Sequence, residues 1–175
     1  MVRALVISGP IASGKSTLAR AVAERLADGG STASVIDLDL LHAMLVRTPP
    51  KRAWSAARRA AASVTDAFVA EGIDVVVTEG EFITPSERAE YVDYLSPSVH
   101  VTFVTLWVSY PEALRRATAD RTRGLSRDPA FLSSHYENTA SALAATPRTD
   151  LLLDTSALTV EAAVDAVVRF VRDSN

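Results

Sequence analysis

The stretch that decides the fold is GPIASGKST at positions 9–17, which has the pattern G-x-x-x-x-G-K-S-T. An apolar run before it predicts a strand over 3–8, and the residues after it predict a helix over 14–27. A phosphate-binding loop of the Walker A type occupies this position between a strand and the helix that follows it. The stretch therefore predicts a site for the phosphates of a nucleoside triphosphate. The alternative is a glycine-rich turn with a surface lysine.

Each residue type in this loop has a physical role in holding phosphate. Glycines let successive backbone N–H groups turn toward the anion, and the start of the following helix adds a partial positive charge. Lys15 is predicted to reach the β- and γ-phosphates, and Ser16 is predicted to offer its hydroxyl to Mg²⁺. The residues predicted to bind the nucleotide here are Gly9, Ala12, Ser13, Gly14, Lys15, Ser16 and Thr17.

The composition indicates one soluble domain that spans residues 1–175. Hydrophobic residues make up 48% of the chain and charged residues 22%, and a net charge of −3 without a long basic tract argues against nucleic acid as a partner. The absence of cysteine excludes disulfides and zinc sites of the cysteine type. The first strand is predicted almost at the start, and no apolar run is long enough to span a membrane. We therefore expect a cytoplasmic protein without a signal peptide.

Short apolar runs alternate with longer helical patterns along the whole chain. The predicted strands are 3–8, 33–37, 74–78, 101–107 and 150–153. The predicted helices are 14–27, 39–46, 52–70, one that begins at a capping box at 84–87, 111–120, one that begins at 128–129, and 160–171. Such alternation predicts an α/β fold with three layers, in which helices cover both faces of a five-stranded parallel sheet.

Polar residues at the carboxyl ends of parallel strands are candidates for the site, because ligands bind at that edge of the sheet. Asp39 follows the second strand, and a carboxylate there can accept the proton of a hydroxyl that receives a phosphoryl group. Asp39 is also placed to cap the short helix, which is compatible with that role. Asp37 competes with it, either as a structural residue at the end of the strand or as a neighbour that orients the site.

Glu79 follows the apolar run of the third strand, as the carboxylate of a Walker B motif does when it holds Mg²⁺ directly or through water. Glu81 is the alternative, and either carboxylate is otherwise a surface residue. Gly80, between them, is expected to leave room for the phosphate loop to approach.

Several arginines surround Gly124 and predict a lid over about 121–128. Arg121, Arg123 and Arg127 are the candidates for contact with the migrating phosphoryl group. The alternative is a solvated, basic helix end whose cations offset the helix dipole. Arg116 is a candidate for stacking on the adenine.

The aromatic residues and histidines give weaker signals. Trp54 and Trp107 are expected to lie in the core, and Trp54 belongs to a helix face that the spacing places inward, with Ala57, Ala61, Val64 and Phe68. The three histidines share no spacing typical of metal ligands. His42 and His135 are therefore assigned ordinary polar roles, with the acceptor pocket as the alternative.

With these residues in hand, the chain resembles the small P-loop kinases, the nucleoside-monophosphate-kinase-like group that holds shikimate kinase, gluconate kinase and chloramphenicol phosphotransferase. The last is the closest fit, because there too the phosphate loop is followed by a strand, an aspartate and an apolar helix, as in LDLLHAM at 38–44. The resemblance implies that Asp39 is the base, and that Asp154 and Thr155 belong to the loop around the adenine. The chain departs from that enzyme at 79–81, where it has Glu-Gly-Glu instead of aspartates.

The resemblance implies an ATP- and Mg²⁺-dependent phosphotransferase that acts on a hydroxyl of a small molecule, either a metabolite or an antibiotic. A nucleotide or nucleic-acid kinase is one alternative, and a regulatory ATPase without a small-molecule acceptor is another. The chain has no N-K-x-D motif, which argues against a GTPase. No motif in the sequence specifies the acceptor or the oligomeric state.

Overall fold

Five parallel strands form the centre of this computed structural model, which describes residues 4–122, 124–145 and 150–173. The strands are β1 (Ala4–Ser8), β2 (Ala33–Asp37), β3 (Val75–Gly80), β4 (Val101–Trp107) and β5 (Leu151–Asp154). The helices are α1 (Lys15–Asp28), α2 (Leu38–Ala43), α3 (Pro50–Ala70), α4 (Pro85–Val92), α5 (Tyr110–Ala119), the 3₁₀ turn η1 (Leu125–Arg127), α6 (Pro129–Ala145) and α7 (Val160–Asp173).

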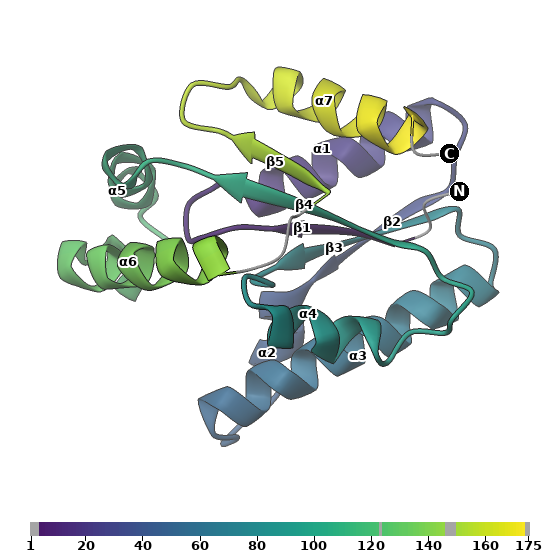
Figure 1. Ribbon diagram of the computed structural model, residues 1–175, viewed down its shortest axis with the longest axis horizontal. Coiled ribbons are helices and arrows are strands. Elements are labelled where there is room, and N and C mark those ends of the chain that lie inside the picture. Colours follow the sequence, from purple (N-terminus) through teal and green to yellow (C-terminus); the bar gives the residue numbers. More distant parts are fainter. Residues whose placement is uncertain (1–3, 123, 146–149, 174–175) are drawn as a thin grey trace.

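The strand order is β2-β3-β1-β4-β5, and every neighbouring pair is parallel. This confirms the predicted five-stranded parallel sheet. In Figure 1, α1 and α7 cover one face of the sheet, and α2, α3 and α4 cover the other. The predicted arrangement of three layers is therefore also confirmed.

One core cluster joins the sheet to α1 and α7. Alternate strand residues such as Leu5, Ile7, Val77 and Leu106 point to this side and are fully buried. They meet apolar rows on the two helices, which are formed by Leu18, Ala19, Val22, Ala23 and Leu26 on α1 and by Ala163, Val164, Val167, Val168 and Val171 on α7. Because α1 begins directly after the phosphate loop, this packing fixes the direction in which the loop opens.

On the other face, α3 packs closely because small residues form its inward row. Its buried positions include Ala53, Ala57, Ala61 and Thr65, which recur every four residues. The prediction that Phe68 packs in the core is wrong, since that side chain is 36% exposed. Phe68 follows Ala61 by seven residues and so shares the direction of this row, but it lies close to the end of α3 at Ala70, where the side chain is less covered.

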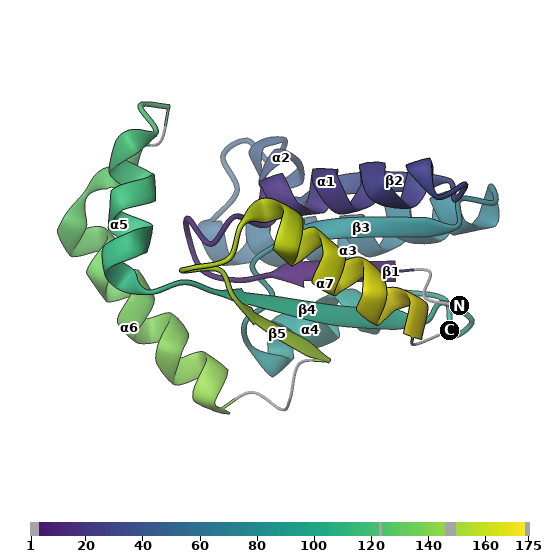
Figure 2. The ribbon, with the colours of Figure 1, turned by 90° about the horizontal axis from the view of Figure 1, so that it is seen from above.

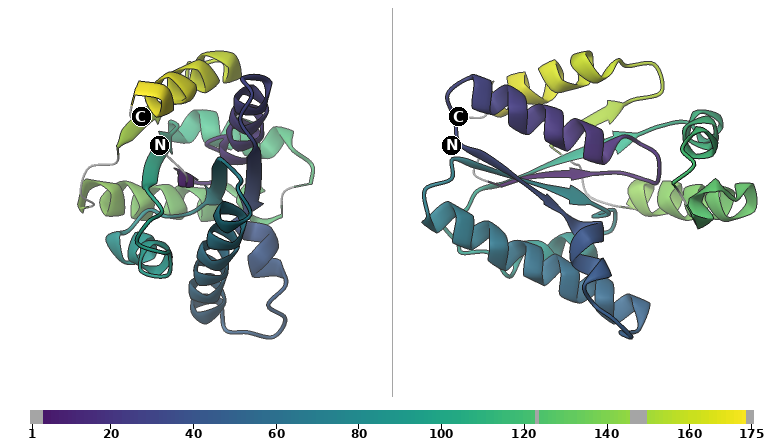
Figure 3. Two further views of the ribbon diagram at one scale, coloured as in Figure 1. Left: turned by 90° about the vertical axis from the view of Figure 1, so that its right-hand side faces the viewer. Right: turned by 180° about the vertical axis from the view of Figure 1, so that it is seen from behind.

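Helices α5 and α6 form a separate layer beyond the carboxyl ends of the strands. Figure 2 shows this layer standing at one end of the sheet, and Figure 3 shows the same arrangement from behind. Its core contains Ala113, Ala117, Leu132 and Tyr136, and Ala12 of the phosphate loop belongs to the same cluster. The layer therefore stands directly against the loop that the sequence predicts to bind phosphate.

Candidate active site

The phosphate loop leaves β1 at a point where only glycine fits. A Cβ on Gly9 would lie 2.6 Å from the carbonyl oxygen of Leu106 and 2.7 Å from Oγ of Ser13. Ala12 adopts a positive φ of 62°, which is uncommon for a residue with a side chain. The Nζ of Lys15 donates hydrogen bonds of 3.0 Å to the carbonyls of Gly9 and Pro10. The loop thus curls around the lysine ammonium and holds it in place.

Two adjacent residues of α6 hold the phosphate loop through hydrogen bonds to the backbone of Ile11. Nε2 of His135 accepts a hydrogen bond of 3.1 Å from the backbone N–H of Ile11, and the Tyr136 hydroxyl donates one of 2.7 Å to the Ile11 carbonyl. Burial lowers the pKa of His135, although nearby Glu81 raises it and Lys15 lowers it further. A neutral imidazole is the form that can accept the Ile11 bond. His135 therefore has a specific contact with the loop, which the sequence did not predict.

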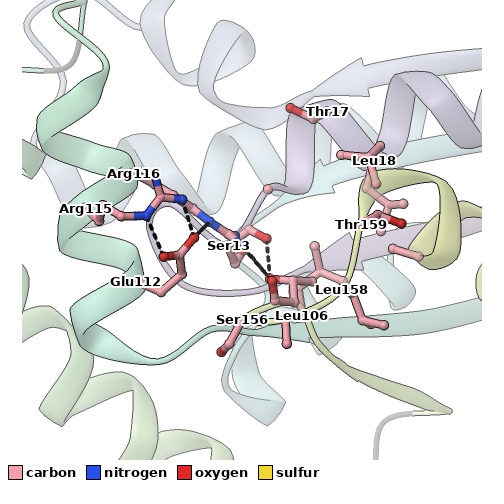
Figure 4. Close-up of a pocket in the computed structure, with 15 residues that line it drawn as sticks. Ser13, Thr17, Leu18, Leu106, Glu112, Arg115, Arg116, Ser156, Leu158 and Thr159 are labelled. Carbon is pink, nitrogen blue, oxygen red and sulfur yellow. Dashed lines mark hydrogen bonds and ion pairs between the residues drawn. The ribbon is translucent and has the colours of Figure 1, made fainter.

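A cavity of about 430 Å³ opens on one side of the loop, between Ser13 and Thr17, Arg116 of α5, and the segment after β5 (Figure 4). Arg116 donates a hydrogen bond of 2.6 Å to the carbonyl of Thr155 and a longer one of 3.4 Å to the carbonyl of Ala12. The Thr155 hydroxyl donates in turn to the carbonyl of Ser13, at 3.0 Å. Arg116 and Thr155 thus lie together at this cavity, where the sequence predicted a nucleotide to bind.

The carboxylates of Asp154 and Glu112 accept hydrogen bonds from residues that line this cavity. The Asp154 carboxylate accepts hydrogen bonds from the backbone N–H and hydroxyl of Ser156, and these bonds lower its pKa. Asp154 does not line the cavity, so its predicted nucleotide contact remains a prediction. Glu112 accepts hydrogen bonds from Arg115 and Arg116, which lower its pKa to about 2 (Figure 4).

A second cavity, of about 620 Å³, opens on the other side of the loop. Asp39 lines it together with Lys15, Ser16 and Glu79. The idea that Asp39 caps α2 is wrong, because the cap is Asp37: its carboxylate accepts hydrogen bonds from the N–H groups of Asp39 and Leu40. The carboxylate of Asp39 is therefore available to the cavity, and Asp37 has the structural role.

Glu79 is a buried carboxylate that β3 carries next to the loop. The strand extends two residues further than predicted, so Glu79 lies within it, paired in register with Asp37 of β2 and Ile7 of β1. Only 4% of the residue is exposed. Burial raises its pKa and the charges of Asp37 and Asp39 add to that, while a hydrogen bond from Ser16 and the charge of Lys15 act in the opposite direction.

The Ser16 hydroxyl and the Glu79 carboxylate are oxygen donors of the kind that Mg²⁺ prefers. Within 4–122, 124–145 and 150–173, no three His, Cys, Asp or Glu side chains gather closely enough to hold a metal ion by themselves. The two residues thus fit an ion that takes its other ligands from phosphate oxygens and water.

Contacts with α2 and α3 hold the segment that follows Glu79. A Cβ on Gly80 would lie 2.6 Å from the Cβ of Leu38, so this glycine allows the start of α2 to approach β3. The expectation that Gly80 makes room for the phosphate loop is wrong in this respect. Arg58, which is buried, donates to the Glu81 carbonyl at 3.3 Å and forms ion pairs with Glu87 and Glu90 at 2.9 and 2.8 Å. These contacts fix the backbone that presents Glu81.

Trp54 is partly buried and packs against the core cluster on this face of the sheet, in line with the prediction. It lines the second cavity and stacks on His42, with ring centroids 3.9 Å apart and an angle of 17° between the planes. Trp54 lies on the inward face of α3, seven residues before Ala61, and its place near the start of the helix brings it to the cavity. Phe131 of α6, which is 43% exposed, lines the same cavity.

The predicted lid lies beside this cavity, but the structure does not bring Arg121 or Arg127 into it. Asp120 and Ser126 line the cavity, whereas Arg121 and Arg127 are exposed and are not among the lining residues. Arg123 lies outside the described residues. The roles of these three arginines in catalysis therefore remain predictions.

The sequence matches the family model described as AAA domain (AAA_33) over residues 5–142. The chain belongs to this family. The matched region runs from β1 into α6, so it includes the phosphate loop, Asp39, Glu79 and His135. Among curated proteins, none matches this sequence.

Solved structures with a similar fold include three kinases. A gluconokinase from Sinorhizobium meliloti 1021 is 20% identical, with a TM-score of 0.69 and coverage of 98% of this chain and 93% of that chain. A sugar kinase from Janibacter sp. HTCC2649 is 19% identical, with a TM-score of 0.69 and coverage of 98% and 95%. A shikimate kinase from Bacteroides thetaiotaomicron is 16% identical, with a TM-score of 0.64 and coverage of 97% and 98%. These likenesses establish the fold, which is that of a small α/β P-loop kinase, as the resemblance predicted.

No helix in the described part of this family member has the combination of length and apolar character that crossing a membrane requires.

Replacing Glu79 with glutamine is expected to stabilise the ligand-free protein at neutral pH. The folded state raises the pKa of Glu79, so protonation of this carboxylate favours the folded state. This stabilisation is fully present below the pKa of the unfolded chain and is lost as pH rises through the folded pKa. Glutamine removes the buried charge, and we expect Tm at pH 7.5 to rise by about 2–4 °C, the equivalent of roughly 1 kcal/mol. The same variant should lose the additional stabilisation that Mg²⁺ gives in the presence of ATP.

Thermal unfolding at pH 5 and pH 7.5, with and without Mg-ATP, measures both effects. The difference in Tm between Glu79→Gln and the parent should shrink at pH 5, where Glu79 is closer to its neutral form. Glu71→Gln, at an exposed position, is the matched control and should change Tm by less than about 1 °C. A lower Tm for Glu79→Gln at pH 7.5 would contradict the prediction.

Proposed function

We propose that this chain is an ATP-dependent kinase that transfers a phosphoryl group to a hydroxyl of a small molecule. The observation that carries the proposal is the position of the two cavities on either side of one phosphate loop. Gly14 and Thr17 line both of them, so a nucleotide can place its base and ribose in the cavity at Arg116 and its terminal phosphate in the cavity at Asp39. The acceptor then enters the second cavity and meets the γ-phosphate there.

The proposed reaction is an in-line transfer. The acceptor oxygen forms a bond to the γ-phosphorus, the bond from that phosphorus to the β–γ bridging oxygen breaks, and ADP leaves with the electron pair. Asp39 takes the proton of the hydroxyl and orients the oxygen toward phosphorus. Lys15 and the loop amides bind the phosphate oxygens, and the lid over 121–128 brings Arg121, Arg123 or Arg127 to the same charge.

Ser16 and Glu79 would hold Mg²⁺, which when bound offsets negative charge on the β- and γ-phosphates. The chain's own contribution is to keep these two oxygens beside Lys15. Glu79 is held within β3, and Ser16 is held at the first turn of α1. The hydrogen bond between the two side chains keeps the Glu79 carboxylate turned toward the loop.

ADP formation in the presence of Mg-ATP and a panel of hydroxylated compounds tests the proposal. We expect turnover that depends on the acceptor, at roughly 1–100 s⁻¹ with a good one. A regulatory ATPase would instead release ADP slowly and at the same rate with every compound. Turnover with nucleosides or nucleic-acid ends alone would identify a nucleotide or nucleic-acid kinase. Either result would overturn the proposal of a small-molecule kinase outside those classes.

A further inference from the structure

The acceptor side of the second cavity is strongly acidic. Four carboxylates line the cavity, those of Asp39, Glu79, Glu81 and Asp120. Of the described residues that line it, Lys15 carries the one permanent positive charge, and its ammonium already donates to two carbonyls of the loop. Burial lowers the pKa of His135, against the opposing charge of Glu81, and so favours its neutral form. Among these lining residues an anionic acceptor therefore meets carboxylates and no free cation, and the lid arginines of the proposed reaction are assigned to the transferring phosphoryl group.

Two arginines contact the segment that follows Glu79, and both already bind other groups. Arg58 is paired with Glu87 and Glu90. Arg88 donates to the Phe82 carbonyl at 3.0 Å and to the Thr105 hydroxyl at 3.2 Å, and its guanidinium lies 4.8 Å from the centre of the Phe103 ring. Neither arginine is among the residues that line the cavity. Both therefore serve the fold rather than the recognition of a carboxylate.

Two aromatic side chains line the same cavity from different elements. Trp54 comes from α3, where its ring is supported by the stack on His42, and Phe131 comes from α6. An aromatic face attracts a cation through the negative charge of its π-system, and tryptophan does so most strongly. Aromatic side chains and carboxylates that line one cavity suit an ammonium group, because both attract positive charge.

Three of the four carboxylates that line the cavity already have a contact or a proposed role. Glu79 is buried within β3 and faces Ser16, and Asp39 is the proposed base for the hydroxyl. Asp120 already accepts hydrogen bonds from the backbone and hydroxyl of Thr122. Glu81 is partly exposed, with 37% of its side chain accessible, and lies 3.6 Å from Nε2 of His135. Of the four, Glu81 is thus best placed to pair with a charge on the acceptor.

We propose that the acceptor is a hydroxylated amine that binds as a cation, with its ammonium group held by Glu81 and the face of Trp54. This inference rests on the proposed kinase function and specifies its substrate class. The transfer itself is unchanged: the acceptor oxygen gains the phosphoryl group, ADP leaves, Asp39 takes the hydroxyl proton, and the ammonium keeps its protons throughout. The charge of the ammonium compensates Glu81, which a neutral or anionic acceptor cannot do.

Three matched sets of compounds separate charge from shape. Each set holds an amine, a neutral analogue and a carboxylate: glucosamine, glucose and glucuronate; serinol, glycerol and glycerate; and phenylalaninol, 3-phenylpropane-1,2-diol and phenyllactate. Binding is measured by calorimetry at pH 7, with the full chain, Mg²⁺ and a non-hydrolysable ATP analogue. Phosphoryl transfer to the same compounds is measured with ATP. In at least one set we expect the amine to bind at least about 10-fold more tightly than both analogues.

Glu81→Gln tests the assigned partner. It should weaken binding of the preferred amine by roughly 10-fold and leave binding of its neutral analogue within about 2-fold, because only the amine loses a charged partner. Glu137→Gln is the matched control: it makes the same change on α6, outside the cavity, and should leave both affinities unaltered.

The outcomes distinguish this inference from the function on which it rests. Acceptor-dependent ADP release that favours a neutral compound or a carboxylate would overturn the amine proposal and leave the kinase proposal standing. Failure of all nine compounds to bind, with normal binding of the Mg-nucleotide, would also overturn the amine proposal. If Mg-ATP itself does not bind, the proposed function fails and the inference fails with it.

Discussion

Asp39→Asn is expected to lower kcat by about 100-fold while leaving the affinity for Mg-ATP within about 2-fold. Asparagine keeps the shape of the side chain but cannot take the proton of the acceptor hydroxyl, and loss of a general base typically costs 10²–10⁴-fold. The fold should be unaffected, because Asp39 does not cap α2. Steady-state kinetics with a saturating acceptor, and calorimetry with Mg-ATP, measure the two quantities.

Asp37→Asn is the matched control for this experiment. Asparagine caps helices about as well as aspartate, so the bonds to the N–H groups of residues 39 and 40 should survive, and turnover should stay within about 3-fold of the parent. Full turnover in Asp39→Asn would contradict the proposed base. If Asp37→Asn shows the large loss instead, the assignment of the two aspartates must be exchanged.

The sequence predicted the fold well because its signals are local. The phosphate loop fixes a strand before it and a helix after it, and the alternation of short apolar runs with amphipathic helices fixes parallel strands. The capping box at Thr84 begins α4 as predicted, with both of its hydrogen bonds present. The end of β3 was less predictable. Glu79 and Gly80 stay in the strand because they pair with Ile7 and Ser8 of β1, and such pairing depends on residues far away in the sequence.

The residues of the phosphate loop could be predicted from a local motif, whereas several residues that line the second cavity could not. Asp37 and Asp39 have equal chemistry, and the starting point of α2, one residue earlier than predicted, decides which of them caps it. Trp54 reaches the cavity because it lies near the start of α3, where the inward face of the helix meets His42 of α2. His135 meets the loop across 124 positions of sequence, and no spacing pattern signals such a contact. These features depend on packing between elements, which a single sequence does not express locally.

Lys15→Ala should lower kcat/KM by about 10²–10³-fold, the size expected when a donor to transition-state charge is removed. Tm of the ligand-free protein should change by less than about 3 °C, because the two hydrogen bonds lost are only partly buried and each contributes little net stability. Lys51→Ala, at an exposed position of α3, is the matched control and should leave both quantities unchanged. Phosphoryl-transfer kinetics and thermal unfolding of the three proteins provide the comparison.

The lysine substitution should also change how Mg²⁺-dependent nucleotide binding responds to pH. The positive charge of Lys15 lowers the pKa of Glu79, so alanine at position 15 raises that pKa further above its ordinary value. Because Glu79 must be ionised to hold Mg²⁺, the pH at which nucleotide binding reaches half its maximum should move upward in Lys15→Ala. Calorimetric titrations of Mg-ATP between pH 5 and pH 8 measure this midpoint. A midpoint that stays in place would show that Lys15 and Glu79 act on the phosphates independently, and would contradict the coupled magnesium site proposed for this loop.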